Sequence, residues 1–290
     1  MVKKVVVNER VLLAGCGDLG RRVAQRLRTV GDEVWALRRQ PPASEDSGIR
    51  WLRGDLARPE TLRGLPAGIT RVVYLPTPDR RDESAYRATF IDGLGHLLDA
   101  LGDESLQRVL LVSSSAVYGE HDGNWVDERT PPAPPGFNGA VLLEAEQMLA
   151  ARRPASVVLR LAGLYGPGRL QLIERLRAGQ VRVPRAQPHW ANRIHVDDAA
   201  AAIVHLLRLA DPLPLYLGVD DTPLPLDVLH DHLAALVGAP VVAAGPAPAA
   251  IGSKRLSNAR LRASGFVPRW PDSREGYAAL VDATSSGIQA

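Results

Sequence analysis

The chain has little cysteine, lysine and aromatic residue, and it lacks any long uninterrupted apolar stretch. Its 290 residues contain one cysteine, Cys16, so an internal disulfide is excluded and a reducing, cytoplasmic location is expected. No apolar run approaches the roughly 20 residues that a membrane helix needs, so no membrane partner is expected. Apart from histidines, the basic side chains are arginines except at Lys3, Lys4 and Lys254. Chemistry that depends on a lysine amine therefore has few candidates.

Charge and metal-ligand patterns exclude further classes. The net charge is only +3, and the arginines occur in scattered pairs rather than in a stripe with interleaved aromatic residues, so no nucleic-acid partner is expected. No His, Cys, Asp and Glu residues stand at metal-ligand spacing, and no metal is expected. Hydrophobic residues make up 46% of the chain and charged residues 23%, which is typical of a soluble globular protein. A small-molecule substrate is the expected partner.

Strand-like and helix-like segments alternate over the first half of the chain. This order predicts an α/β fold, a Rossmann-type doubly wound parallel sheet. Beyond residue 161 the pattern loosens into Pro- and Gly-rich turns, which predicts a smaller C-terminal substrate lobe. The expected dinucleotide-binding domain comprises residues 1–163 and the later segment 194–218, and the expected lobe comprises residues 164–193 and 219–290. The expected strands are 11–14, 33–37, 49–52, 71–75, 108–113 and 156–161, and the expected helices are 19–30, 59–64, 84–102, 139–152, 196–209 and two that begin near 226 and 273.

A glycine-rich turn follows the first expected strand and opens the first expected helix. Its pattern is Gly15-x-Gly17-x-x-Gly20. These glycines allow a tight turn and a close backbone approach to a diphosphate, and the helix N-terminus attracts the phosphate charge. An ordinary strand-to-helix turn is the alternative. In this context the pattern predicts dinucleotide binding by Gly15, Gly17, Asp18, Leu19 and Gly20.

The end of the second expected strand indicates which dinucleotide is bound. NAD-binding proteins usually place Asp or Glu there to accept from the ribose 2′-hydroxyl, whereas this chain has Arg38 and Arg39. Two guanidinium groups favour a 2′-phosphate, so we expect NADP(H) rather than NAD(H). A solvated arginine pair is the alternative. Asp55 is expected at the adenine end or as a turn cap, and Leu56, Leu75 and Ser113 complete the expected cofactor contacts.

Three later segments carry a family resemblance. Residues 113–119 read Ser-Ser-Ser-Ala-Val-Tyr-Gly, residues 159–168 read Leu-Arg-Leu-Ala-Gly-Leu-Tyr-Gly-Pro-Gly, and residues 193–198 read Arg-Ile-His-Val-Asp-Asp. Together they resemble the extended short-chain dehydrogenase/reductase family of the NAD-dependent epimerase/dehydratase type, over about residues 12–280. The resemblance implies hydride transfer between nicotinamide and a carbonyl or carbinol carbon, often on a nucleotide-linked sugar.

The resemblance also implies a catalytic Ser together with a Tyr-x-x-x-Lys pair, and this chain departs from that pattern. Ser115 matches the serine, but Asn138 and Leu142 stand at the tyrosine and lysine positions. An atypical, divergent branch of the family is therefore indicated. Ser115 is expected to polarise a substrate oxygen, and the other catalytic candidates are Tyr118 as a proton donor and Tyr165 as a residue that faces the nicotinamide. Each of the three has a structural alternative: a strand-end hydrogen bond for the serine, and packing for the two tyrosines.

Three hypotheses follow for the function. The first is an NADP(H)-dependent oxidoreductase or epimerase/dehydratase-like enzyme with non-standard acid/base groups, with a nucleotide sugar as one candidate substrate. The second is a catalytically impaired NADP(H)-binding sensor or regulatory protein, and the third is a structural partner subunit. By analogy with the family, the segment Asp92–Leu101 and the helix after Asn138 are candidates for a homodimer interface.

Overall fold

The computed structural model describes residues 8–43, 48–102, 104–153, 155–249 and 251–285. Contacts divide the chain into two compact units. Unit 1 comprises residues 1–113, 137–159 and 200–215, and unit 2 comprises residues 114–136, 160–199 and 216–290. Unit 2 thus includes residues 114–136, which the division by sequence assigns to the dinucleotide-binding domain. The function of unit 2 as a substrate lobe stays a prediction.

A seven-stranded sheet forms the framework of the molecule. The central strands are β1 (Arg10–Ala14), β4 (Arg71–Tyr74) and β5 (Arg108–Ser114). They are rich in Val and Leu and mostly buried, as expected for a parallel sheet covered on both faces. Strand β1 pairs in parallel with β2 and β4, and the order reverses at this point, so the predicted doubly wound α/β fold is confirmed. The sheet order is β12 (Leu215–Gly218), β7 (Val157–Leu161), β5 (Arg108–Ser114), β4 (Arg71–Tyr74), β1 (Arg10–Ala14), β2 (Glu33–Arg38) and β3 (Arg50–Arg53).

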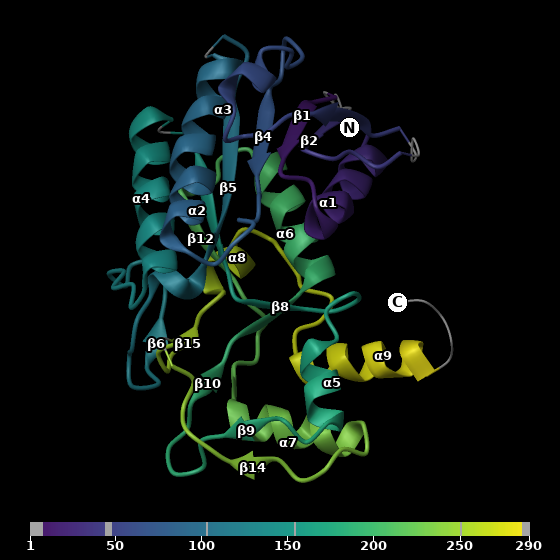
Figure 1. Cartoon of the computed structure of the whole chain (residues 1–290), viewed down its shortest axis with the longest axis vertical. Coiled ribbons are helices and arrows are strands. Elements are labelled where there is room, and N and C mark those ends of the chain that lie inside the picture. Colours follow the sequence, from purple (N-terminus) through teal and green to yellow (C-terminus); the bar gives the residue numbers. More distant parts are fainter. Residues whose placement is uncertain (1–7, 44–47, 103, 154, 250, 286–290) are drawn as a thin grey trace, which may run out of the picture. The chain divides into compact units, whose positions relative to one another are not determined.

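Helices cover both faces of the sheet in unit 1. On one side lie α2, α3 and α4, and on the other lie α1 and α6 (Figure 1). The expected elements occur within a few residues of their predicted bounds, although residues 59–64 form only a short 3₁₀ helix and the helix expected at 84–102 is divided into three segments. Strand β12 was not predicted, because it lies in a Pro-rich segment that the sequence analysis assigns to turns. The helical elements of this region are α1 (Asp18–Thr29), η1 (Pro59–Leu62), α2 (Glu83–Arg87), η2 (Ala88–Asp92), α3 (Gly93–Leu101), α4 (Phe137–Arg152) and α6 (Val196–Arg208).

The helix expected over 84–102 is interrupted by a π-helical turn, η2. A π turn replaces the usual i→i+4 hydrogen bond, so a carbonyl of the helix can accept from another donor. In this turn the Tyr74 hydroxyl, from the end of β4, donates to the carbonyl of Thr89. A Cβ on Gly93 would lie 2.8 Å from that hydroxyl oxygen. The irregular turn therefore holds the helix against the end of β4.

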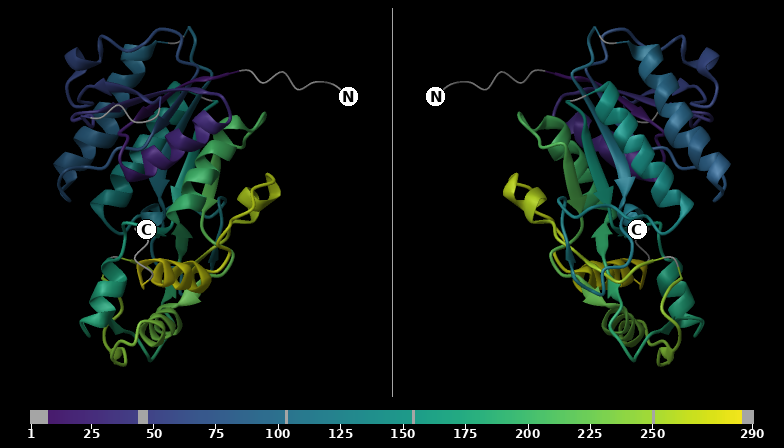
Figure 2. Two further views of the ribbon diagram at one scale, coloured as in Figure 1. Left: turned by 90° about the vertical axis from the view of Figure 1, so that its right-hand side faces the viewer. Right: turned by 90° about the vertical axis from the view of Figure 1, so that its left-hand side faces the viewer.

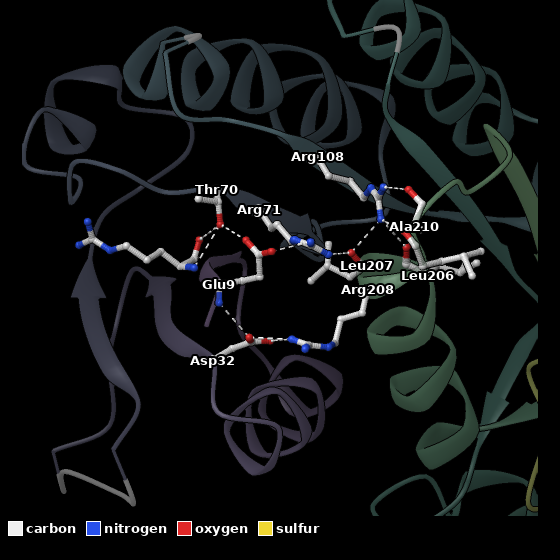
Figure 3. Close-up of polar contacts among 11 residues, drawn as sticks. Glu9, Asp32, Thr70, Arg71, Arg108, Leu206, Leu207, Arg208 and Ala210 are labelled. Atoms are coloured by element: carbon white, nitrogen blue, oxygen red, sulfur yellow. Dashed lines mark hydrogen bonds and ion pairs between the residues drawn. The ribbon is translucent and has the colours of Figure 1, made fainter. Parts of the chain in front are cut away.

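The C-terminal end of α6 is capped by arginines from two neighbouring strands (Figure 3). Arg108 donates to the carbonyls of Leu206, Leu207, Leu209 and Ala210, and Arg71 donates to that of Leu207. These guanidinium groups satisfy carbonyls that the helix leaves without partners, and their charge complements the negative end of the helix dipole.

Carboxylates complete this network on the β1 side. Asp32 accepts from Arg208 Nη1 at 2.7 Å with both oxygens and from the backbone N–H of Glu9 at 3.0 Å. Glu9 in turn accepts from Thr70 Oγ1 at 2.7 Å and from Arg71 Nη2 at 2.6 Å. The network links β1, β4 and α6 at the amino-terminal edge of the sheet, opposite the Gly-rich turn.

Replacing Asp32 with alanine is expected to lower the free energy of unfolding by about 2–4 kcal/mol, because a buried charged partner of Arg208 is lost. The Asp32 side chain is only 1% exposed. The matched control is Glu144→Ala, which breaks the exposed Arg87–Glu144 pair and should cost less than about 1 kcal/mol. Urea unfolding followed by circular dichroism measures both, and equal losses would contradict the role of burial.

Unit 2 is built from helices around an apolar core and from short two-stranded pairs. Helix α7 (Leu226–Leu236) packs against α5 (Gln171–Arg177) and α9 (Ser273–Ser285) (Figure 2). Their buried side chains, including Ile173, Leu229 and Leu280, form the core. The other elements are η3 (Ser115–Val117), α8 (Ala259–Ala263) and the pairs β6 (Trp125–Val126) with β15 (Arg255–Leu256), β8 (Gly163–Tyr165) with β11 (Arg193–His195), β9 (Arg182–Val183) with β14 (Ala243–Ala244), and β10 (Trp190–Ala191) with β13 (Leu224–Pro225).

Within the residues that the structure describes, no helix is long and apolar enough to cross a membrane.

Candidate functional site

The Gly-rich turn follows β1, and the backbone conformation of its first residue, Gly15, requires glycine. Gly15 has φ +88°, and a Cβ there would lie 2.4 Å from the Cα of Pro76. The N–H groups of Gly15 and Cys16 both donate to the carbonyl of Leu37, at 3.0 and 3.2 Å. The turn is therefore held between the ends of β2 and β4.

The N-terminus of α1 faces open space. Gly17 is its N-cap residue, and a Cβ on Gly17 would meet nothing within 4 Å. Gly20 packs tightly instead, since a Cβ there would lie 3.0 Å from the sulfur of Cys16. The two glycines thus have different functions: Gly20 allows the helix to approach the turn, and Gly17 keeps side chains away from the positive end of the helix dipole.

A cavity of about 710 Å³ opens at this turn, within unit 1. Ligand pockets usually enclose roughly 300–1,000 Å³. Six of the predicted cofactor residues line the cavity, namely Gly15, Gly17, Arg38, Arg39, Asp55 and Leu56, whereas Asp18, Leu19, Gly20, Leu75 and Ser113 do not. The cavity also includes residues that the sequence analysis did not single out: Cys16, Leu37, Gln40, Gly54, Ala57, Pro76, Thr77, Asp79, Arg80, Ala85, Ala88 and Thr89.

The residues of the cavity suit a dinucleotide. Backbone without side chains at Gly17 suits a diphosphate, and Arg38 and Arg39 lie at the end of the neighbouring strand β2, on the adenosine side in this type of fold. Burial raises the pKa of the Cys16 thiol to about 11, so this sulfur stays protonated at neutral pH and is a poor nucleophile. The turn therefore offers binding surface rather than covalent chemistry.

The polar residues at the ribose end differ in how they are engaged. Arg39 forms a two-pronged ion pair with Asp79, through both terminal nitrogens and both carboxylate oxygens. Arg38 is half-buried; its backbone carbonyl accepts from the N–H of Gly54 at 3.2 Å, but its guanidinium group makes no hydrogen bond or ion pair with the described residues. Asp55 accepts from the N–H of Ala57 at 3.0 Å, so it caps the following turn while its side chain borders the cavity.

The three catalytic candidates lie in unit 2, in different environments. Ser115 begins η3 and is half-buried, and its hydroxyl makes no hydrogen bond with the described residues. The buried Tyr118 hydroxyl donates to the carbonyl of Asp127 at 3.1 Å and accepts from Arg160 Nη1 at 2.6 Å. Tyr118 is therefore engaged as a packing residue, and its catalytic role stays a prediction.

Tyr165 is buried in an aromatic cluster. Its ring stacks on Tyr277 at 4.4 Å between centroids and meets His195 edge-on at 5.2 Å. Its hydroxyl has no hydrogen-bond partner among the described residues. Burial raises the pKa of this phenol further above its ordinary value. A neutral phenol is thus favoured, which suits a hydrogen-bond donor better than a base.

Helix α4 carries Asn138 and Leu142, the two residues that the sequence analysis aligns with the family's Tyr-x-x-x-Lys pair. Asn138 is half-buried in its first turn, and Leu142 is buried one turn later. One further turn along, the buried Glu146 accepts a hydrogen bond of 2.5 Å from Ser113 Oγ. Ser113, predicted as a cofactor contact, is thus bound to α4 at the end of β5.

Two polar groups in unit 2 escaped the sequence analysis. Lys254 is buried and donates to the carbonyls of Gly119 and Gly252 at 3.3 and 3.1 Å; its isolation as the sole lysine after Lys4 was a usable signal. Asp220 is 2% exposed. Burial raises its pKa to about 8, outweighing the lowering by the N–H of Thr222 and the charge of Arg193. No sequence pattern marks it.

The fold and the cavity together define a Rossmann-type dinucleotide-binding protein. The profile described as "NAD dependent epimerase/dehydratase family" matches residues 11–214. The chain therefore belongs to the NAD-dependent epimerase/dehydratase family, whose members typically use NAD or NADP. This finding confirms the family that the motifs at 113–119, 159–168 and 193–198 resemble.

The chain is also similar to several individual proteins and solved structures. Protein YeeZ of Escherichia coli K12 is 30% identical over 209 residues, 69% of this chain and 73% of that protein. The 3-diazoavenalumate denitrifying reductase of a Streptomyces species is 28% identical over 300 residues, 92% and 98% of the two chains. A structure from Methylobacillus flagellatus, provisionally described as an NAD-dependent epimerase/dehydratase, is 40% identical to this chain with a TM-score of 0.81, and the match covers 96% of this chain and 100% of that one. The structure of MoeE5 in complex with UDP-glucuronic acid and NAD is 26% identical to this chain with a TM-score of 0.79, and the match covers 96% of this chain and 99% of that one.

Proposed function

We propose that the protein is an NADP(H)-dependent oxidoreductase that acts on a carbonyl or carbinol carbon. The observation that carries the proposal is the cavity at the Gly-rich turn, with a side-chain-free backbone at Gly17 and the unengaged Arg38 in place of the acidic residue of NAD sites. The similarity to the denitrifying reductase supports reduction as the direction of the chemistry. MoeE5 binds a nucleotide sugar, so this substrate class stays a candidate.

The nicotinamide ring supplies or accepts a hydride when it is bound. Among the predicted catalytic groups, Ser115 suits the polarisation of a substrate oxygen best, because its hydroxyl is not committed to another partner. Tyr165 could donate from a phenol that stays neutral. Asn138 and Leu142 offer no basic group, so proton transfer is proposed to use a side chain other than the usual Tyr-Lys pair.

A sensor or regulatory protein is the second candidate function. It is favoured by the burial of Leu142 at the position of the family's lysine, where no side-chain amine is available. Under this proposal the chain binds the dinucleotide without turning it over. The two candidates differ in one measurement, the oxidation of NADPH in the presence of a panel of carbonyl compounds and nucleotide sugars, with Ser115→Ala as the comparison. A homodimer through α3 and α4 is a further proposal that either candidate allows.

NADPH is expected to bind the protein about tenfold more tightly than NADH or better, because a charge-assisted contact to Arg38 is worth about 1.5–3 kcal/mol. Arg38→Ala should remove most of this difference while NADH affinity changes little. Arg53→Ala is the matched control, since Arg53 stands opposite Arg38 on β3 and does not line the cavity. Titration calorimetry on the purified parent protein and the two variants measures the affinity of each for NADPH and for NADH. Equal affinities of the parent protein for the two cofactors would contradict the NADP(H) assignment.

A further inference from the structure

The two arginines at the end of β2 are not equivalent, although both line the same cavity. Arg39 is held by Asp79, which lies in the segment after β4 and also lines the cavity. The hydrogen bonds and charge of Arg39 lower the pKa of Asp79, so this carboxyl group is ionised at neutral pH. Arg38 has no such counter-ion among the described residues. One arginine is thus neutralised within the protein, and the other is available to a ligand.

The geometry of the Arg39–Asp79 pair is that of an anion bound by an arginine. Both terminal nitrogens meet both carboxylate oxygens, which is the arrangement that guanidinium groups also form with phosphates. A ribose 2′-phosphate and the Asp79 carboxylate therefore compete for the same donors. They also carry charge of the same sign, so they repel each other when both are near Arg39.

The pair is also open to exchange. Its side chains are 55% and 60% exposed, and ion pairs in this environment contribute little because water and salt screen them. A phosphate with charge of about −1.5 to −2 attracts an arginine more strongly than a carboxylate with charge −1. A ligand phosphate can therefore displace Asp79 from Arg39, but it loses affinity in doing so.

We propose that Asp79 determines the cofactor specificity of this site by occupying Arg39 in place of a 2′-phosphate. This inference rests on the proposed function and deepens it. With NADH bound, Asp79 keeps Arg39 neutralised, so the ribose hydroxyls do not face a second unpaired cation. With NADPH bound, Arg38 is the principal ligand of the 2′-phosphate, and Arg39 contributes only to the extent that Asp79 is displaced. Asp79 thereby lowers the preference for NADPH over NADH below that of a site with two unpaired arginines.

Asp79→Asn tests the inference by direct titration. The substitution keeps the size of the side chain and removes its charge, and the position is exposed, so the fold should be unaffected. We expect NADPH to bind about five- to tenfold more tightly than to the parent protein, because Arg39 is released for a charge-assisted contact. NADH should change by less than about twofold. Adenosine 2′,5′-bisphosphate and 5′-AMP, used as probes of the ribose end alone, should show the same contrast.

A double-mutant cycle makes the test specific to the pair. Arg39→Ala should weaken NADPH binding little in the parent protein and about five- to tenfold in the Asp79→Asn background. Glu60→Gln is the matched control, since it removes one exposed negative charge of unit 1 that does not line the cavity. Equal gains from Glu60→Gln and Asp79→Asn would reduce the effect to net charge and overturn the inference.

The outcomes separate this inference from the proposed function. If the parent protein binds both cofactors and Asp79→Asn leaves the NADPH-to-NADH ratio unchanged, the inference is wrong and dinucleotide binding stands. If Arg39→Ala costs the same in both backgrounds, Asp79 does not control Arg39 and the inference is also wrong. If none of the four probes binds the folded parent protein, the proposed function is wrong and the inference is overturned with it.

Discussion

Replacing Gly17 with alanine is expected to leave the fold intact and to weaken NADPH binding by about 100-fold or more, because a methyl group would stand where the diphosphate approaches the backbone. The structure separates these two effects. A Cβ at Gly17 meets nothing within 4 Å, and the backbone φ of −87° lies outside the positive-φ region that favours glycine. The methyl group therefore causes no clash inside the protein. Calorimetric titration with NADPH and a thermal melt of the same sample test both halves of the prediction.

Two further glycines make the comparison sharp. Gly15→Ala should lower the melting temperature, because residue 15 has φ +88° and its Cβ would lie 2.4 Å from the backbone of Pro76. Gly64→Ala places a methyl group in open, exposed space away from the cavity, and both stability and affinity should stay near those of the parent. Normal NADPH binding by the Gly17→Ala protein would show that this turn does not form the diphosphate site.

Asp220→Asn is expected to stabilise the protein strongly at alkaline pH and hardly at all in acid. The pKa of Asp220 is raised to about 8 by burial, whereas in the unfolded chain it is near 3.9. Between these values the folded state holds a proton that the unfolded state has released, so the parent protein loses stability as pH rises through this window. Above pH 8 the loss is complete, at up to about 5 kcal/mol. Asparagine cannot ionise and escapes this cost.

The measurement is the free energy of unfolding in urea at pH 5, 7 and 9 for both proteins. The advantage of Asp220→Asn over the parent should grow from pH 5 to pH 9. Asp122→Asn is the matched control in the same unit, and it should change the free energy much less because its side chain is exposed to water. An Asp220→Asn protein whose advantage is the same at all three pH values would show that the buried carboxyl group does not titrate in this range.

Local patterns were sufficient for most of the fold. Apolar runs such as Val11–Ala14 and Arg71–Leu75 predict buried parallel strands, and the glycines at 15, 17 and 20 predict the turn after the first of them. Strand β12 was missed because Leu215–Gly218 is only four residues long and lies among prolines. The π turn at 88–92 was missed because the hydroxyl of Tyr74, which donates to the carbonyl of Thr89 in this turn, comes from another segment of the sequence.

Local motifs in the sequence indicated single residues of the candidate site. They could not indicate which pairs of distant side chains meet there. Gly17, Arg38 and Asp55, which the sequence predicts as cofactor contacts, line the cavity, and their contact with a cofactor stays a prediction. The pairing of Arg39 with Asp79 joins residues 40 positions apart, and only the tertiary structure brings them together. The same holds for Asp220, whose raised pKa comes from burial by distant segments. Hydrophobic periodicity locates elements, but it does not report which polar side chains meet between them.

The arginine caps on α6 have a consequence for the order of folding. Arg71 and Arg108 lie in the first 110 residues, but the carbonyls that they bind belong to residues 206–210, about 100 or more positions later. A growing chain thus presents β4 and β5 long before their acceptors emerge from the ribosome. Closing so long a loop is slow and entropically costly. Docking of α6 is therefore expected to be a late step, and chains that stop before residue 206 should leave this edge of the sheet exposed to chaperones.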